Sequence, residues 1–288
     1  MLKVVPLALF VGAAAFVSTS SLRDARADAA FKVPVVTVHA SEFAFAAPKS
    51  ITAGQTTFRL VNDGKMLHHI TILKLEQGKT MKDLAAVLND PNAAASPPEW
   101  LVSVGGPNAA VPGATIEATL DLAPGNYVLA CFIPSPGDPT PHAMKGMVAP
   151  LTVNAPSGVT QAGETFAPTP TPDVHLVVQD YGFQFSKPIT AGKHTIHVMN
   201  NGPQDHEVIM LKLAPAKHVA DFNTWAMGDM KGPPPAMPIA GMAGMAKGRT
   251  GIFSDDFTPG TYAITCYVTA PDKKTHAEHG MSTEFVVK

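Results

Sequence analysis

The sequence predicts an all-β protein made of two tandem Greek-key β-sandwich domains, each with a short inserted helix. Short runs that alternate apolar and polar residues, bounded by Gly, Pro and Asn, recur along the chain, as in Thr57-Phe58-Arg59-Leu60-Val61. Landmarks of the first half return in the second at an offset of about 138 residues, which indicates a duplicated domain. Pro124-Gly125-Asn126-Tyr127 and Pro259-Gly260-Thr261-Tyr262 each resemble the tyrosine corner of Greek-key sandwiches.

The first residues have the pattern of a secretory signal peptide. Lys3 precedes an apolar run over 4–16, and small residues around Ala27 offer a cleavage site. The run is too short to span a bilayer comfortably. We therefore assign 1–27 to a signal peptide and expect an exported, periplasmic protein whose mature chain has no membrane span. A membrane anchor or a disordered tail is the alternative.

The charge balance excludes one class of partner. Cleavage after Ala27 removes Lys3, Arg23, Arg26 and Asp24, which leaves 18 basic and 22 acidic residues and a formal charge of -4. This mature chain has no basic footprint for nucleic acid.

The first domain is expected over 31–155 and the second over 173–288, joined by a Pro/Thr-rich linker over 156–172 that should be extended and semi-flexible. The alternating runs predict half-buried antiparallel strands. Thr80 and Asp83 resemble a capping box before residues with helical spacing. Val219, Phe222 and Ala226 predict the second helix less clearly.

Two copies of a three-residue cassette point to copper. Ten residues separate Cys131 from His142, and four more separate His142 from Met147. Cys266, His276 and Met281 repeat this order with nine and four intervening residues. A thiolate, an imidazole and a thioether form the soft ligand set that suits copper. In an exported protein, a disulfide between the only two cysteines is the structural alternative.

A fourth ligand follows from aligning the chain with itself. The segment 61–68 matches 199–206, so that His68 corresponds to His206, whereas His69 corresponds to Glu207. A strand alternates its faces, and only one of the two adjacent histidines can point toward a given site. The repeat therefore favours His68.

Other candidate ligands lie nearby. Met144 and His279 could replace Met147 and His276, but their counterparts in the other repeat are Glu278 and Lys145, so we favour the duplicated residues.

These motifs resemble the cupredoxin, or type 1 blue-copper, family. The Asn-x-Gly-x-x-x-His strand and the Cys-loop-His-x-x-x-x-Met segment stand where plastocyanin-like domains have them, and the resemblance covers nearly all of both repeats. It implies two copper ions per chain, cycling between Cu(I) and Cu(II). The residues that it assigns to the first and second sites are His68, Cys131, His142 and Met147, and His206, Cys266, His276 and Met281. The Cys-to-His loops are longer than in small electron carriers of the family, as in the blue-copper domains of nitrite reductases.

Electron transfer with an unknown redox or copper-exchange protein partner is the expected function, without enzymatic activity. Nitrite reductases and multicopper oxidases pass the electron through a histidine beside the site cysteine, but Phe132 and Tyr267 follow the two cysteines here, and no His-x-His pair is present. The alternatives are periplasmic copper storage or delivery, a copper-free interaction module, and a copper oxidoreductase. Met237, Met242 and Met245, expected to form a methionine-rich loop, would suit copper delivery, although apolar packing is the plainer interpretation.

Overall fold

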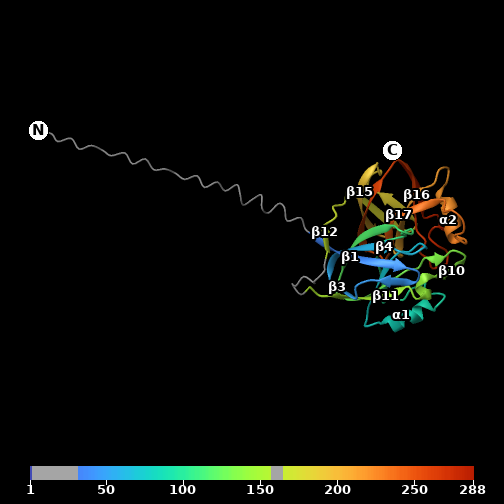
Figure 1. Ribbon diagram of the computed structural model, residues 1–288, viewed down its shortest axis with the longest axis horizontal. Helices are drawn as coiled ribbons and strands as arrows, with labels where there is room; N and C mark the ends of the chain where they lie inside the picture. The colour runs from blue at the N-terminus through green and yellow to red at the C-terminus, as the bar shows by residue number, and fades with distance from the viewer. Residues whose placement is uncertain (2–31, 157–164) are drawn as a thin grey trace.

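The computed structural model describes Met1, 32–156 and 165–288. The expected signal peptide after Met1 and part of the expected linker lie outside the described residues. In the described part, the chain forms two β-sandwiches with one α-helix in each (Figure 1). The predicted fold class is confirmed.

The first domain has two facing sheets. One contains β1 (Lys32–Ser41), β2 (Ala44–Ala46), β4 (Gly54–Asn62) and β7 (Thr115–Leu122). The other contains β3 (Ser50–Thr52), β5 (Thr71–Leu75), β6 (Leu101–Gly105), β8 (Gly125–Ala130) and β11 (Val148–Asn154). Helix α1 (Met81–Leu88) lies between β5 and β6, and the small hairpin of β9 (Pro134–Ser135) and β10 (Asp138–Pro141) precedes the 3-10 helix η3 (His142–Lys145).

The second domain repeats this order. Its first sheet contains β13 (Val174–Gln179), β14 (Gly182–Phe185), β15 (Gly192–Asn200) and β18 (Thr250–Phe257). Its second sheet contains β16 (His206–Leu213), β17 (Ala236–Met245), β19 (Gly260–Thr265) and β20 (Ser282–Val287), with α2 (Val219–Met227) between β16 and β17. Strand β12 (Thr165–Pro168), from the expected linker, pairs with β1 of the first domain.

Strand pairing departs from the antiparallel expectation at two places in the first domain and at one place in the second. β1 pairs with β4 in parallel, and β13 pairs with β15 in parallel. In the first domain the chain crosses to β3 in the opposite sheet before it returns as β4, and this crossover allows the parallel direction. A third parallel pair joins β11 to β3.

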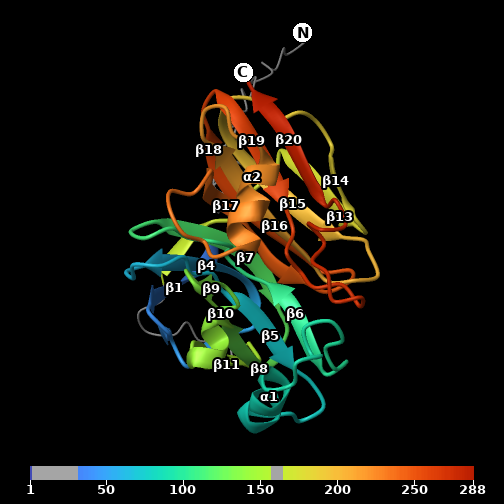
Figure 2. The same cartoon turned by 90° about the vertical axis from the view of Figure 1, so that its right-hand side faces the viewer.

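Both sheets run through the two domains. β7 meets β18 at the pair Thr119 and Ile252, and β17 meets β6 at the pair Met245 and Val104. One buried apolar cluster accordingly contains residues of both domains. Figure 2 shows the second domain stacked on the first, with β17 and β7 near the junction.

The helices explain why two central strands are more buried than expected. Leu84 of α1 packs with Leu73 and Leu75 of β5, and Phe222 of α2 packs with Leu211 of β16. These contacts cover the outer face of each second sheet, so that β5 and β16 are buried almost throughout. The predicted capping box of α1 is confirmed, since the Asp83 carboxylate accepts the backbone N–H of Thr80 at 2.9 Å.

Both tyrosine corners are present. The Tyr127 hydroxyl donates to the carbonyl of Ala123 at 2.8 Å, and the Tyr262 hydroxyl donates to the carbonyl of Thr258 at 2.8 Å. Each bond lies four residues upstream of the tyrosine and fixes the turn before the strand that ends at the site cysteine.

The methionine-rich segment is a strand, not a loop. Met237, Met242 and Met245 all belong to β17, and Met242 and Met245 are fully buried in the shared core. The expectation of a loop was wrong because this segment pairs with β16 and continues the sheet into the first domain. Among the described residues, none of the helices is long and apolar enough to cross a membrane.

Candidate metal centres

The first domain brings three predicted ligands together at one end of the sandwich. His68 lies just before β5, where its backbone forms a bridge with Ala110, and Cys131 directly follows β8. His142 begins η3, which places its Nδ1 3.6 Å from the Cys131 sulfur. The ligand atoms of His68, Cys131 and His142 all lie within 4.8 Å of one another. With Met147, these residues are called site 1 below.

The long loop of site 1 is held by backbone hydrogen bonds around the cysteine. The Ala143 amide donates to the Cys131 carbonyl at 2.7 Å, and the Cys131 amide donates to the Met147 carbonyl at 3.3 Å. The extra loop length is used by the hairpin of β9 and β10, and therefore does not separate the ligand residues.

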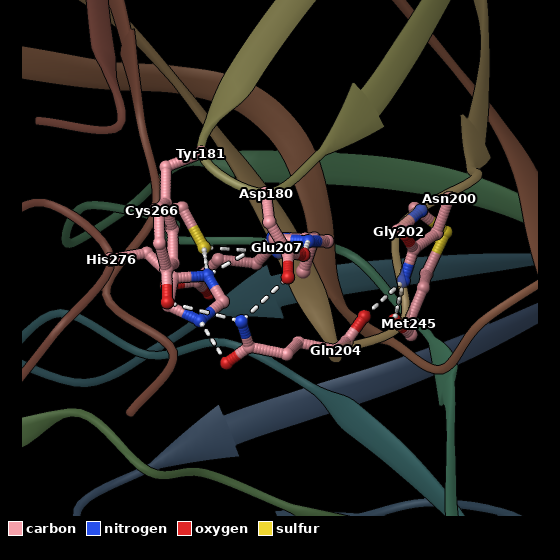
Figure 3. A network of polar contacts seen from close by, with 10 residues as sticks. Asp180, Tyr181, Asn200, Gly202, Gln204, Glu207, Met245, Cys266 and His276 are labelled. Atoms are coloured by element: carbon pink, nitrogen blue, oxygen red, sulfur yellow. Dashed lines mark hydrogen bonds and ion pairs between the residues drawn. The ribbon is translucent and has the colours of Figure 1, made fainter. Parts of the chain in front are cut away.

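The second domain builds an equivalent group. His206 is the first residue of β16, and Cys266 directly follows β19. The Nδ1 atoms of His206 and His276 are 3.0 Å apart, and the Cys266 sulfur lies 3.5 Å from His276 Nδ1. Figure 3 shows Cys266 and His276 beside their polar neighbours. With Met281, these residues are called site 2.

Buried asparagines shape the turn that leads to each N-terminal histidine. Asn62 donates to the carbonyls of Met66 and Ala110 at 2.7 and 2.8 Å and accepts the amide of Gly64. Asn200 makes the equivalent bonds to Gln204, Met245 and Gly202 (Figure 3). The Asn-x-Gly pattern thus stabilises the turn before each of these histidines.

Glycine is required in these turns because the ligand histidine packs against it. A Cβ at Gly64 would lie 2.9 Å from His68 Nε2, and a Cβ at Gly202 would lie 2.7 Å from His206 Nε2.

The two candidate methionines of site 1 differ in burial. Met147 is fully buried in the same core cluster as Cys131, whereas 51% of Met144 is exposed. Met281 is likewise fully buried. This burial favours Met147 over Met144 as the thioether of site 1.

His279 is engaged outside the ligand group of site 2. Its ring stacks on Tyr181 with ring centroids 4.6 Å apart, and its Nε2 lies 3.1 Å from an oxygen of Asp272.

The donor set of site 1 contains an unsatisfied histidine. Within the described residues, His68 Nδ1 and Nε2 are the buried side-chain nitrogen or oxygen atoms that have no hydrogen-bond partner. An unpaired buried polar atom is costly. A metal ion bound to one of these nitrogens would remove part of this cost, so the residues of site 1 fit a metal.

Burial determines the protonation of the histidines and cysteines in both sites. It lowers the pKa of His142 and of His276 to about 4, with a smaller contribution from the neighbouring histidine of each site. It also raises the pKa of the Cys131 thiol to about 12 and raises that of Cys266. Neutral imidazoles are ready to bind a metal, whereas a metal must displace each thiol proton.

An acidic residue and an aromatic residue cover the histidines of each site, and sequence reasoning missed them. Phe43 packs edge-on against His142 with ring centroids 5.2 Å apart, and Tyr181 does the same to His276 at 5.0 Å. Glu42 and Asp180 precede these two aromatic residues. The offset that relates His68 to His206 also relates these pairs, and this was the available signal.

The acidic residues make different contacts in the two sites. Asp180 Oδ1 accepts His206 Nε2 at 2.6 Å and is held by Gln204 (Figure 3). Glu42 instead accepts the backbone amides of Lys65 and Met66, and its nearest oxygen lies 3.9 Å from His68 Nε2. The two sites therefore share their ligand types but differ in the charge beside the N-terminal histidine.

His69 and Glu207 lie outside the two ligand groups and bind the backbone beside the cysteines. His69 Nε2 accepts the Phe132 amide at 2.8 Å, and Glu207 Oε1 accepts the Tyr267 amide at 2.8 Å. Both cysteines are free and buried, so the disulfide alternative does not hold.

Each domain thus combines a Greek-key sandwich with a His-Cys-His group at one end. The chain has the fold of a two-domain cupredoxin, and its two His-Cys-His groups fit type 1 copper sites. Neither a protein-family model nor a curated protein sequence matches it.

Several solved cupredoxins are similar to the chain. A dithionite-reduced auracyanin from Roseiflexus castenholzii is 24% identical over 42% of this chain and 96% of its own, with a TM-score of 0.31. Auracyanin A, a blue copper protein from Chloroflexus aurantiacus, is 22% identical over 42% of this chain and 99% of its own, with a TM-score of 0.29. A copper-containing nitrite reductase from Thermus scotoductus is 12% identical over 88% of this chain and 61% of its own, with a TM-score of 0.24. Because these TM-scores are low, the resemblance to cupredoxins rests on the sandwich and the ligand groups of this chain.

Proposed function

We propose that the chain is an exported electron carrier with one mononuclear type 1 copper site in each domain. The ligands would be His68, Cys131, His142 and Met147 in site 1, and His206, Cys266, His276 and Met281 in site 2. Copper bound there would supply one-electron exchange between Cu(I) and Cu(II).

The observation that carries this proposal is the donor set itself. Two imidazoles and a cysteine sulfur converge in each domain, with a buried methionine just after the loop that carries the second histidine. This is the ligand combination of blue-copper electron-transfer sites. The pairing of soft sulfur with neutral imidazole favours copper over Mg²⁺ or Ca²⁺, which prefer oxygen ligands.

The positions of the ligands also suit repeated electron transfer. His206 begins β16 and Cys266 follows β19, and these two strands are hydrogen-bonded to each other. The His276 amide and the Met281 amide are both bonded to backbone carbonyls of the same loop. Such a frame limits rearrangement of the ligands when the charge of the site changes.

The contacts of two residues favour a carrier over an oxidoreductase. His69 and Glu207 stand next to ligand histidines, where they could serve a second metal, but His69 is bonded to Phe132 and Asn108. Glu207 is bonded to Tyr267 and Asn108. The polar side-chain atoms of His69 and Glu207 therefore already have hydrogen-bond partners inside the protein.

Copper delivery is less well supported than electron transfer. Met242 and Met245 are buried in the core, and only Met237 of this group, 45% exposed, faces solvent. Export rests on the signal-peptide pattern over 1–27 and on its expected cleavage after Ala27.

The test is copper content and absorption of the mature chain. We expect two coppers per chain and a strong blue band that disappears on reduction and returns on oxidation. Cys131→Ser and Cys266→Ser should each remove one copper and about half of the band. His279→Gln is the matched control near site 2 and should keep both coppers.

Other outcomes would identify the alternatives. A colourless chain with tight Cu(I) binding would indicate delivery, and turnover of nitrite or oxygen would indicate an oxidoreductase. Absence of copper uptake by both domains would leave a copper-free interaction module.

A further inference from the structure

We propose that Asn108 connects the two sites through a buried hydrogen-bonded path that carries an electron from one domain to the other. This inference rests on the proposed copper sites and concerns what the chain does between them. The path, called the interdomain bridge below, consists of His69, Asn108 and Glu207.

The first half of the bridge begins at the cysteine of site 1. Phe132, which follows Cys131, donates its amide to His69 Nε2 at 2.8 Å. On the other side of the ring, His69 Nδ1 lies 3.3 Å from Asn108 Oδ1. The thiolate is therefore joined to Asn108 by covalent bonds and two hydrogen bonds.

The second half begins at the cysteine of site 2. Tyr267, which follows Cys266, donates its amide to Glu207 Oε1 at 2.8 Å. The other carboxylate oxygen of Glu207 accepts Asn108 Nδ2 at 3.1 Å. Asn108 thus completes an unbroken sequence of bonds between the two cysteines, and its bond to Glu207 joins residues that are 99 positions apart in the sequence.

The orientation of the Asn108 amide is fixed by its surroundings. Nδ2 also lies 3.2 and 3.3 Å from the backbone carbonyl oxygens of Val208 and Met242, and it shares its two protons among these oxygens and the Glu207 carboxylate. Carbonyl oxygens accept only, so the NH₂ group must face the second domain and Oδ1 must face His69. Because Oδ1 accepts, His69 must carry its proton on Nδ1, and its Nε2 is then free to accept the Phe132 amide.

The bridge is sealed from water. Asn108 is fully buried, and His69 and Glu207 are 6% and 7% exposed. Hydrogen bonds in a low-dielectric interior strengthen and polarise one another, and the packed interior leaves no solvent gap along the path.

The bridge breaks the symmetry of the duplication. Gly106 and Gly241 occupy equivalent places, since a Cβ at either would lie 2.0 Å from a carbonyl oxygen, of Ile70 and of Val208 respectively. Asn108 lies two residues after Gly106, and Ala243 lies two residues after Gly241. The second repeat therefore has no side-chain amide at this position, and Asn108 of the first repeat connects the two sites.

The transfer is balanced in electrons and protons. With copper bound at both sites, the ion held by one ligand group would be oxidised from Cu(I) to Cu(II), and its electron would reduce the ion held by the other group from Cu(II) to Cu(I). Each hydrogen bond keeps its donor, so no proton crosses the interface. A carrier that receives its electron at one domain could then release it from the other.

The bridge can be cut by two different substitutions. Asn108→Leu removes the hydrogen bonds to His69 and Glu207, together with those to the carbonyls of Val208 and Met242. Glu207→Gln keeps the size of the side chain but replaces one oxygen by an NH₂ group. This donor would face either the Tyr267 amide or Asn108 Nδ2, which are donors themselves, so one of the two bonds is lost. The matched control is Thr119→Val, which removes the buried 2.7 Å hydrogen bond to Thr57 at the same domain junction.

The experiment is flash reduction of the copper-loaded chain followed by optical recording of electron exchange between sites. Cys131→Ser and Cys266→Ser supply the spectrum of each site alone. We expect Asn108→Leu and Glu207→Gln to slow the exchange by at least about tenfold, which is the lower end of the activity losses found when partners of metal ligands are changed. Both should retain two coppers, and Thr119→Val should exchange at the original rate.

A second readout needs no copper. Nitrogen-15 NMR of the metal-free chain should show the His69 proton on Nδ1, and Asn108→Leu should abolish this preference. A proton on Nε2, or unchanged exchange in both bridge variants that hold two coppers, would overturn the bridge and leave the proposed carrier intact. Failure of the original chain to bind copper would overturn both, and metal analysis distinguishes that case.

Discussion

The contacts of single residues distinguish two sites that have the same ligand types. His206 Nε2 is bonded to a carboxylate oxygen of Asp180 at 2.6 Å, whereas the Glu42 carboxylate stays 3.9 Å from His68 Nε2. A carboxylate bonded to a ligand imidazole makes that imidazole a stronger donor. A stronger donor favours the oxidised ion, so site 2 should have the lower reduction potential.

Asp180→Asn should raise the potential of site 2. Loss of the negative charge beside His206 is expected to shift it by about 60 mV, which corresponds to a tenfold change in a one-electron equilibrium. A spectroelectrochemical titration in the Cys131→Ser background measures site 2 alone. Glu42→Gln in the Cys266→Ser background is the control, and an equal or larger shift there would contradict this assignment.

Gly106 is needed because the backbone of a neighbouring strand leaves no room for a side chain. Its φ is +148°, and a Cβ would lie 2.0 Å from the Ile70 carbonyl oxygen. Gly106→Ala should therefore lower the free energy of unfolding by about 3 kcal/mol. Urea unfolding of the metal-free chain measures this loss.

Gly113→Ala is the control for backbone strain alone. Gly113 has a φ of +78° and no atom within 4 Å of an added Cβ, so its substitution should cost only about 1 kcal/mol. Equal losses for the two variants would show that the contact with Ile70 is unimportant.

At the scale of elements, tyrosine corners and short turns place the strands that end at the ligands. Tyr127 and Tyr262 each bond to a carbonyl four residues upstream, just before β8 and β19. The two corners are not identical, because the Tyr262 hydroxyl also accepts the Thr258 amide at 3.1 Å.

Tyr262→Phe should therefore destabilise the chain more than Tyr127→Phe. Tyr127→Phe loses one hydrogen bond, worth about 1 kcal/mol, and Tyr262→Phe loses two. Chemical denaturation of the metal-free variants gives both values. A larger loss for Tyr127→Phe would show that bonds other than these decide the stability of the corners.

At the scale of the whole molecule, the two domains share sheets and a core. Met242 of the second domain lies at this junction, since a Cβ at Gly105 of the first domain would come 3.0 Å from its sulfur. It is fully buried and belongs to the cluster that contains both domains. The domains should therefore unfold together.

Met242→Ala should lower the free energy of unfolding by about 3 kcal/mol, because a large buried side chain is lost. Met237→Ala on the same strand is the control, since its side chain is 45% exposed and its loss should change the stability by less than about 0.5 kcal/mol. Calorimetry of the metal-free chain should show one transition for the original protein. Two separate transitions would contradict the shared core.

The sequence by itself predicted the duplicated sandwich and the inserted helices. Alternation with a period of two and the choice of turn residues depend only on a few neighbouring residues, so both can be recognised in the sequence alone. The internal repeat also related His68 to His206, and the structure brings both beside a cysteine of their own domain.

Only the tertiary structure decided what joins the two domains. The bond between Asn108 and Glu207 depends on how strands far apart in the chain pack, and Asn108 has no counterpart in the repeat that could have drawn attention to it. The same packing makes the segment with Met242 and Met245 a buried strand. It also places His69 where it accepts the amide of Phe132, beside Cys131. Local pattern determines the elements, whereas contacts between distant side chains arise only when the sheets of both domains meet.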